Sequence, residues 1–265
     1  MHHVDLSPFQ RPIPVVTGIE LAYPRIAQWD GWWIPERVGP EAPYHHRAVV
    51  HLHALLEGFV ARQGRNLSLA RDLAIRFVED QPRIGIAPDL CVLDPAPAAA
   101  NDLASLCLWK PGHVRPPLCI EIVSHAHTHK NYATIHERYA YMHAAELVLF
   151  DPTLAGPKAL GGPVPLQLWR RSESGTLVRV SHGAQPAYCQ YLNAWLLPDR
   201  QLLEIAEDRE GRWRWPSTVT PLKPTLAHDS TSKNGSAPIA PTRLQQCSRR
   251  ATPGRPGTLG LTFQS

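Results

Sequence analysis

PDLCVL at residues 88–93, followed by LCIEIVS at 118–124 and ELVLFDP at 146–152, decides the fold of this chain. Each stretch is a short apolar run next to proline, a pattern typical of a buried β-strand. Asp89 opens the first run and Glu121 lies inside the second. A carboxylate is costly to bury unless it is paired or binds a cation. We therefore expect both carboxylates to converge at one end of a sheet.

Two carboxylates on consecutive strands can share one divalent ion. Mg²⁺ suits such a site because it binds through one or two carboxylates and keeps several waters. The sequence therefore predicts a Mg²⁺ or Mn²⁺ site formed by Asp89 and Glu121. Two alternatives stay open: Asp89 can belong to a Pro-Asp turn at the strand start, and Glu121 can pair with an arginine such as Arg76.

Periodicity on either side of these runs predicts a mixed α/β (α+β) domain. Apolar residues recur at helical spacing over 45–63 and over 131–143, and alternation over 67–78 indicates a half-buried strand. We expect both helices to pack on one sheet. The strands of that sheet are predicted at 89–93, 118–123 and 147–150, with a long connection at 94–117, further strand signals at 166–169, 176–180 and 202–206, and a cover for the core edge at 195–197.

Composition divides the chain into three parts. Residues 1–28 are an irregular, proline-containing lead-in, and residues 29–216 form the predicted domain. Residues 217–265 are rich in Ser, Thr, Pro and Gly, so we expect a disordered tail that cannot bury enough apolar surface to fold. This tail carries six Lys/Arg and one Asp, which leaves 21 basic and 22 acidic residues in 1–216. The predicted domain therefore has no global positive charge that would attract nucleic acid.

The same composition narrows the class of protein. No apolar run is long enough to cross a membrane, and the N-terminus lacks the pattern of a secretory signal. The five cysteines are odd in number and contain no CxxC, which argues against a disulfide framework and a zinc ribbon. We expect a cytoplasmic protein with reduced thiols. The sequence leaves the oligomeric state open, and a homodimer is one option.

The order and spacing of these motifs resemble the PD-(D/E)XK nuclease superfamily, specifically the Uma-type restriction endonuclease family. The resemblance covers roughly residues 29–215 and implies a restriction-endonuclease-like mixed sheet flanked by helices, here with extra C-terminal strands. It also implies metal-dependent phosphodiester hydrolysis of DNA or another nucleic acid. The matching residues are His46, Pro88-Asp89, Glu121 with Val123-Ser124, Tyr139-Ala140, Glu146 and Asp151-Pro152.

The resemblance implies that Asp89 and Glu121 hold the metal and that a lysine orients the attacking water. The two positions where the family usually has this lysine are occupied here by Val123 and Ile135. A subgroup of the family has Lys-Asp-Tyr just before the helix, and Lys130-Asn131-Tyr132 matches it except for the Asn, so the resemblance implies Lys130 as the candidate catalytic lysine.

Departures from the family pattern support a second hypothesis. Asn131 stands where the family has an aspartate, and Asp30-Gly31 is followed by Trp32 instead of an acid. The alternative is a catalytically inactive module that keeps the nuclease fold for binding or regulation. The basic group nearest the carboxylates, Lys130 or Arg138, distinguishes the two hypotheses.

Other motifs have a simpler structural explanation beside a functional one. His125, His127 and His129 form an HxHxH run that suits zinc on a strand, but the resemblance places the run in a loop. Trp32-Trp33 and Trp213/Trp215 can stack bases or fill the core. Ser124 lacks the surroundings of a nucleophile, and Glu57 can be a site carboxylate or part of a solvated helix face.

Overall fold

The structure is a computed structural model. It describes residues 20–21, 32–34, 42–124, 135–156, 158 and 162–217. Almost all of the lead-in, the first turn of the predicted helix at 131–143 and, beyond Ser217, the whole predicted tail lie outside the described residues.

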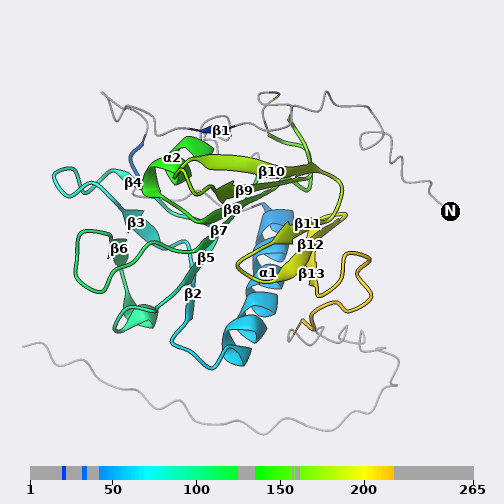
Figure 1. Ribbon diagram of the computed structural model, residues 1–265, viewed down its shortest axis with the longest axis horizontal. Coiled ribbons are helices and arrows are strands. Elements are labelled where there is room, and N and C mark those ends of the chain that lie inside the picture. The colour runs from blue at the N-terminus through cyan, green and yellow to red at the C-terminus, as the bar shows by residue number, and fades with distance from the viewer. Residues whose placement is uncertain are drawn as a thin grey trace, which may run out of the picture. The chain divides into compact units, whose positions relative to one another are not determined.

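A seven-stranded mixed sheet forms the centre of the domain (Figure 1). Strands β7 and β8 are parallel, and every other neighbouring pair is antiparallel. Its strands in spatial order are β1 (Glu20–Leu21), β10 (Leu177–Gly183), β9 (Leu166–Arg171), β8 (Glu146–Phe150), β7 (Leu118–Ile122), β5 (Leu90–Leu93) and β2 (Ser68–Arg71). The predicted strands at 89–93, 118–123 and 147–150 therefore share one sheet, which confirms the mixed-sheet α+β prediction.

Among the described residues, two helices and two small sheets accompany the large sheet. The helices are α1 (Pro43–Arg62) and α2 (Ile135–Met142), and Ala100–Asp102 forms one 3₁₀ turn. One small sheet has the order β11 (Ala187–Cys189), β12 (Ala194–Asp199), β13 (Leu202–Ala206), and the other has the order β4 (Gly85–Ile86), β3 (Ala74–Arg76), β6 (Ser105–Cys107).

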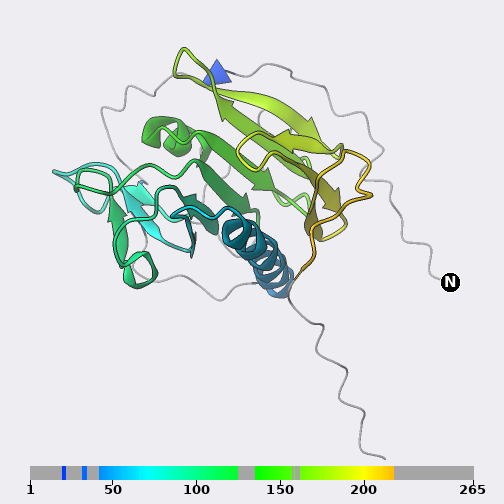
Figure 2. The same ribbon diagram turned by 60° about the horizontal axis from the view of Figure 1, so that its bottom comes forward.

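Helix α1 covers one face of the large sheet. It begins at Pro43, where a missing backbone N–H costs nothing, and its buried residues follow helical spacing. These residues belong to one core cluster that also contains residues of β5, β7, β8 and β9 in the large sheet and of β11–β13 in the C-terminal small sheet. Helix α1 and the C-terminal small sheet therefore form one layer on the same face of the large sheet (Figure 2). The α1 members of the cluster are Ala48, Val49, Leu52, Leu55, Leu56 and Phe59.

Helix α2 covers the opposite face. Because side chains alternate along a strand, Cys119 and Leu147 point away from α1 and pack with Ile135, Tyr139 and Met142 of α2. The small sheet β4-β3-β6 adds to this second core cluster. The large sheet is thus buried on both faces, which explains why β7 and β8 are apolar almost throughout.

Three details differ from the predicted elements. The predicted strand at 67–78 is two strands, β2 and β3, which belong to different sheets and are separated by Asp72 at a positive φ of 51°. The apolar part of the connection at 94–117 contributes β6, which pairs with β3. Residues 195–197, expected only to cover the core edge, lie in β12.

Glu146 joins the large sheet to the C-terminal small sheet. This buried carboxylate at the start of β8 accepts hydrogen bonds from Nε of Arg170 at 2.7 Å and from the backbone N–H groups of Gln190 at 3.1 Å and Tyr191 at 2.8 Å. The Cys189 thiol is a fourth donor at 3.2 Å. The family motif residue Glu146 is therefore a structural residue that fixes the segment after β11.

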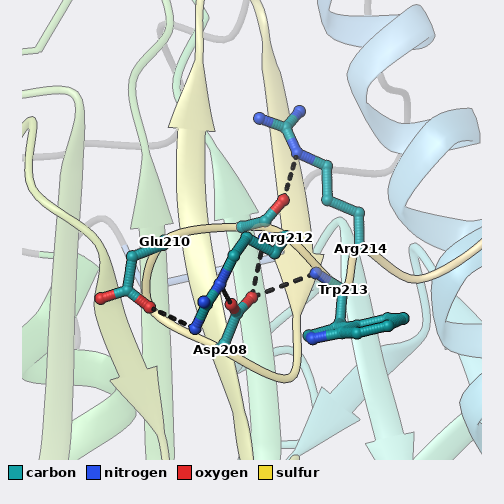
Figure 3. A network of polar contacts seen from close by, with 6 residues as sticks. Asp208, Glu210, Arg212, Trp213 and Arg214 are labelled. Atoms are coloured by element: carbon teal, nitrogen blue, oxygen red, sulfur yellow. Dashed lines mark hydrogen bonds and ion pairs between the residues drawn. The ribbon is translucent and has the colours of Figure 1, made fainter.

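A surface turn after β13 returns the chain to α1. The carboxylate of Asp208 accepts hydrogen bonds from the backbone N–H of Arg212 at 2.8 Å and of Trp213 at 3.1 Å, and from Nε of Arg212 at 2.6 Å (Figure 3). The turn lets Trp215 stack on Phe59, with ring centroids 5.6 Å apart. Trp215 is therefore a core residue, whereas Trp213 is exposed.

Candidate metal and active site

Asp89 and Glu121 lie at the same end of two neighbouring strands. Strands β5 and β7 are antiparallel with Leu90 opposite Ile120, and continuing this register by one residue places Asp89 opposite Glu121. The Oδ2 atom of Asp89 accepts a hydrogen bond from the backbone N–H of Ile122 at 2.6 Å. This bond attaches the Asp89 carboxylate to the strand that carries Glu121.

His45 is the second contact of Asp89. Its Nε2 lies 3.3 Å from Oδ2 of Asp89, and both side chains are buried. The family resemblance pointed to His46, but His46 is exposed. The sequence pattern indicates that His45 is buried. It precedes Val49 and Leu52 by four and seven residues and so lies on the same buried stripe of α1.

Glu121 is fully buried at 0% exposure, and α2 supplies its described partner. The Tyr139 hydroxyl donates a hydrogen bond to Oε1 of Glu121 at 2.7 Å. Burial raises the pKa of Tyr139, and the nearby Glu121 raises it further, so the phenol stays a donor. Arg76, the alternative partner expected from the sequence, donates instead to the carbonyl oxygen of Pro82.

Arg138 places a buried positive charge beside this pair. It precedes Tyr139 on α2, and its guanidinium lies 5.7 Å from the ring centroid of Trp32. Burial lowers the pKa of Arg138, whereas the charges of Glu121 and Tyr139 act to raise it. The charge of Glu121 therefore favours the protonated form of the Arg138 guanidinium.

The positions expected for a lysine are apolar and closed. Val123 and Ile135 are 4% and 2% exposed, so neither leaves a solvent-filled gap at the site. Lys130 and Asn131 lie outside the described residues, as does the HxHxH run.

The two carboxylates suit a hard divalent ion. Asp89 and Glu121 supply only oxygen donors, which Mg²⁺ and Mn²⁺ prefer, and a Mg²⁺ site needs only one or two carboxylates. Within the described ranges, no three His, Cys, Asp or Glu side chains are grouped to hold a metal ion. The oxygen donors of these two carboxylates fit a hard divalent ion such as Mg²⁺ or Mn²⁺.

The other candidate residues named from the sequence lie in the core or on the surface. Glu57 is 59% exposed and contacts only His53 of its own helix among its described ion pairs, at 3.5 Å. Ser124 is buried just after β7, and Trp32 is buried, whereas Trp33 is exposed beside the Arg83 guanidinium. Glu57 thus belongs to a solvated helix face.

Tyr139→Phe tests the support of Glu121. Because a hydrogen bond to a charged group contributes about 1.5–3 kcal/mol, we expect a loss of that size in the free energy of unfolding. Tyr188→Phe is the matched control, because the Tyr188 hydroxyl contacts Asn193 at the surface. Urea unfolding of both variants measures the difference, and equal stabilities would contradict the assigned role of Tyr139.

The mixed sheet with buried carboxylates on adjacent strands defines a restriction-endonuclease-like class of protein. A family model described as "Uma2: Putative restriction endonuclease" matches residues 20–223. The chain therefore belongs to the Uma2 family, as its motifs predicted.

One similar solved structure is a crystal structure from Anabaena variabilis ATCC 29413, whose title describes a putative nuclease belonging to DUF820. Its sequence is 16% identical, and the match covers 54% of this chain and 70% of that chain with a TM-score of 0.37. A search of curated proteins gave no match. Among the described helices, none has the length and apolar character needed to span a membrane.

Proposed function

We propose that this protein is a Mg²⁺-dependent nuclease that hydrolyses phosphodiester bonds in DNA or another nucleic acid. The observation that carries the proposal is the hydrogen bond from the Ile122 N–H to Asp89, which attaches this buried carboxylate to the strand that carries the buried Glu121. Membership of the Uma2 family supports the reaction class.

The chain's own residues have distinct roles in this proposal. Asp89 and Glu121 would hold the ion, Tyr139 orients Glu121 through Oε1, and His45 lies against Oδ2 of Asp89. Bound there, Mg²⁺ would polarise a phosphoryl oxygen and lower the pKa of a water. Because both carboxylates are buried and fixed, they need little rearrangement to bind an ion.

A positive group completes the proposed site. Lys130 follows the strand that carries Glu121 and would orient the attacking water and stabilise the developing negative charge. Arg138 adds a second positive charge, because it is buried beside Tyr139 and the charge of Glu121 favours its protonated form. Arginine stays protonated, so Arg138 suits charge stabilisation rather than proton abstraction.

A specific observation favours the alternative of an inactive binding or regulatory module. Buried Val123 and Ile135 occupy the two positions where the family usually has a lysine. In that case the fold and the metal carboxylates persist while the hydrolytic step is lost.

Lys130→Ala separates the two functions. We expect it to reduce Mn²⁺- or Mg²⁺-dependent cleavage of DNA by about 100-fold or more, because proton-transfer and charge-stabilising groups each contribute on that scale. Mn²⁺ binding should be unchanged, since the lysine acts on the water. The matched control is Lys158→Ala, which removes an exposed lysine.

Each outcome of this assay selects one account. Cleavage by the wild-type protein that Lys130→Ala retains would keep the nuclease and reject Lys130 as its lysine. No cleavage of DNA or RNA by the wild-type protein with either metal would select the binding module.

A further inference from the structure

A pocket of about 360 Å³ lies between the end of α2 and the connection after β6, apart from the carboxylate pair. Five of its seven described lining residues are aromatic or aliphatic, and the other two are an arginine and a histidine. The lining residues are Phe77, Leu108, Trp109, Arg115, Tyr141, Met142 and His143. The volume lies at the lower end of the range for small-ligand sites and suits one nucleotide.

Aromatic packing fixes one wall of the pocket. The rings of Phe77 and Tyr141 have centroids 5.4 Å apart, and the edge of each ring contacts Trp32 from centroid distances of 6.3 and 5.9 Å. Trp109 is half-buried, so part of its indole is accessible at the pocket. Fixed rings of this kind stack on unpaired bases, and every base offers a flat face for such stacking.

Arg115 brings a positive charge to the lining of the pocket. Burial lowers the pKa of His143, and the nearby guanidinium groups of Arg171 and Arg115 lower it further. Arg171 is held in place by the carbonyl oxygens of Ala140 and Ala144, each at 2.9 Å. Arg115 is exposed and available to a ligand. A phosphate group would complement the Arg115 guanidinium.

The pocket and the candidate active site both use residues of α2. Tyr141 lines the pocket and Tyr139 binds Glu121, two residues earlier, which is a helical rise of about 3 Å. The Trp32 ring contacts Tyr141 and lies near the Arg138 guanidinium.

We infer that this pocket binds one unstacked base of a single-stranded nucleic acid, with the base against Trp109, Phe77 and Tyr141 and its phosphate on Arg115. The inference rests on the proposed function for the class of substrate. To that function, the inference adds a preference for unpaired strands and a base-binding site that needs no metal. The pocket would bind the strand on which the proposed nuclease acts.

Fluorescence anisotropy with a labelled oligo-dT in EDTA tests this inference without requiring cleavage. Stacking on one aromatic side chain contributes enough that Trp109→Ala should weaken binding about 5- to 100-fold. Arg115→Ala should also weaken binding and reduce its salt dependence. The matched controls are Trp213→Ala and Arg200→Ala, which remove an exposed indole and an exposed guanidinium, and both should bind like the wild-type protein.

An abasic oligonucleotide with the same phosphates separates base from backbone recognition. We expect the wild-type protein to bind it more weakly than oligo-dT, with no further loss in Trp109→Ala and a further loss in Arg115→Ala. Equal affinity for the two strands, tighter binding of duplex DNA, or no binding at all would overturn the inference. DNA cleavage without base-dependent binding would refute this site alone, whereas base-dependent binding without cleavage would refute the nuclease alone.

Discussion

Asp89→Asn and Glu121→Gln are each expected to abolish Mn²⁺ binding while the fold is retained. Each substitution removes the negative charge that attracts the ion but keeps an oxygen acceptor, for the Ile122 N–H in one case and for the Tyr139 hydroxyl in the other. Mutating residues that only support metal ligands weakens metal binding about 10- to 100-fold, so loss of a ligand should exceed this range. Isothermal titration calorimetry measures the affinity, and circular dichroism checks the fold.

The same variants should be as stable as the wild-type protein, or more stable, when no metal is bound. Two like charges buried side by side repel each other, and neutralising one removes that repulsion. Glu57→Gln is the control, because it neutralises an exposed carboxylate. Metal affinity that stays unchanged in both site variants would refute the shared site, and a large loss of stability would show that the carboxylates are structural.

Glu146→Ala is expected to destabilise the protein by about 3–5 kcal/mol, because several donors lose one buried carboxylate acceptor and each unsatisfied group costs about 1–3 kcal/mol. The substitution would leave the Arg170 guanidinium and the backbone N–H groups of Gln190 and Tyr191 without their acceptor. Glu146→Gln should lose less, because its carbonyl oxygen can still accept hydrogen bonds from some of these donors. Urea unfolding measures both variants.

Glu210 provides a matched control for this prediction. Its exposed carboxylate contacts Arg212 at 3.4 Å in the surface turn, so Glu210→Ala should leave the free energy of unfolding almost unchanged (Figure 3). If Glu146→Ala were no more destabilising than Glu210→Ala, Glu146 would not join the two sheets as we describe.

The sequence predicted the strands that are buried on both faces and the helix that has one apolar stripe. Strands β5, β7 and β8 are short apolar runs buried on both faces, and α1 has a clear apolar stripe, so periodicity alone located them. The pattern at 67–78 was misread because alternation continues across Asp72, where the chain turns into another sheet. Which strands pair is set by long-range contacts, and the short strands β6 and β11 carry little local signal.

The candidate site was predictable only in part. Asp89 and Glu121 stood out because charged residues are unusual in apolar strands. The hydrogen-bond partners of these carboxylates could not be predicted, because the hydrogen bond from Tyr139 to Glu121 depends on how α2 packs on the sheet. The motif pointed to His46, whereas the stripe of α1 would have selected His45. The Phe77–Tyr141 wall joins distant segments and left no motif.

A DNA cleavage assay with Mn²⁺ on the wild-type protein and Glu121→Gln tests the proposed metal-dependent nuclease most directly. We expect the wild-type protein to cut DNA in Mn²⁺ and not in EDTA, and Glu121→Gln to show no cutting in either condition. Cutting that persists in EDTA, or that is equal in Glu121→Gln, would contradict a nuclease whose metal is held by Asp89 and Glu121.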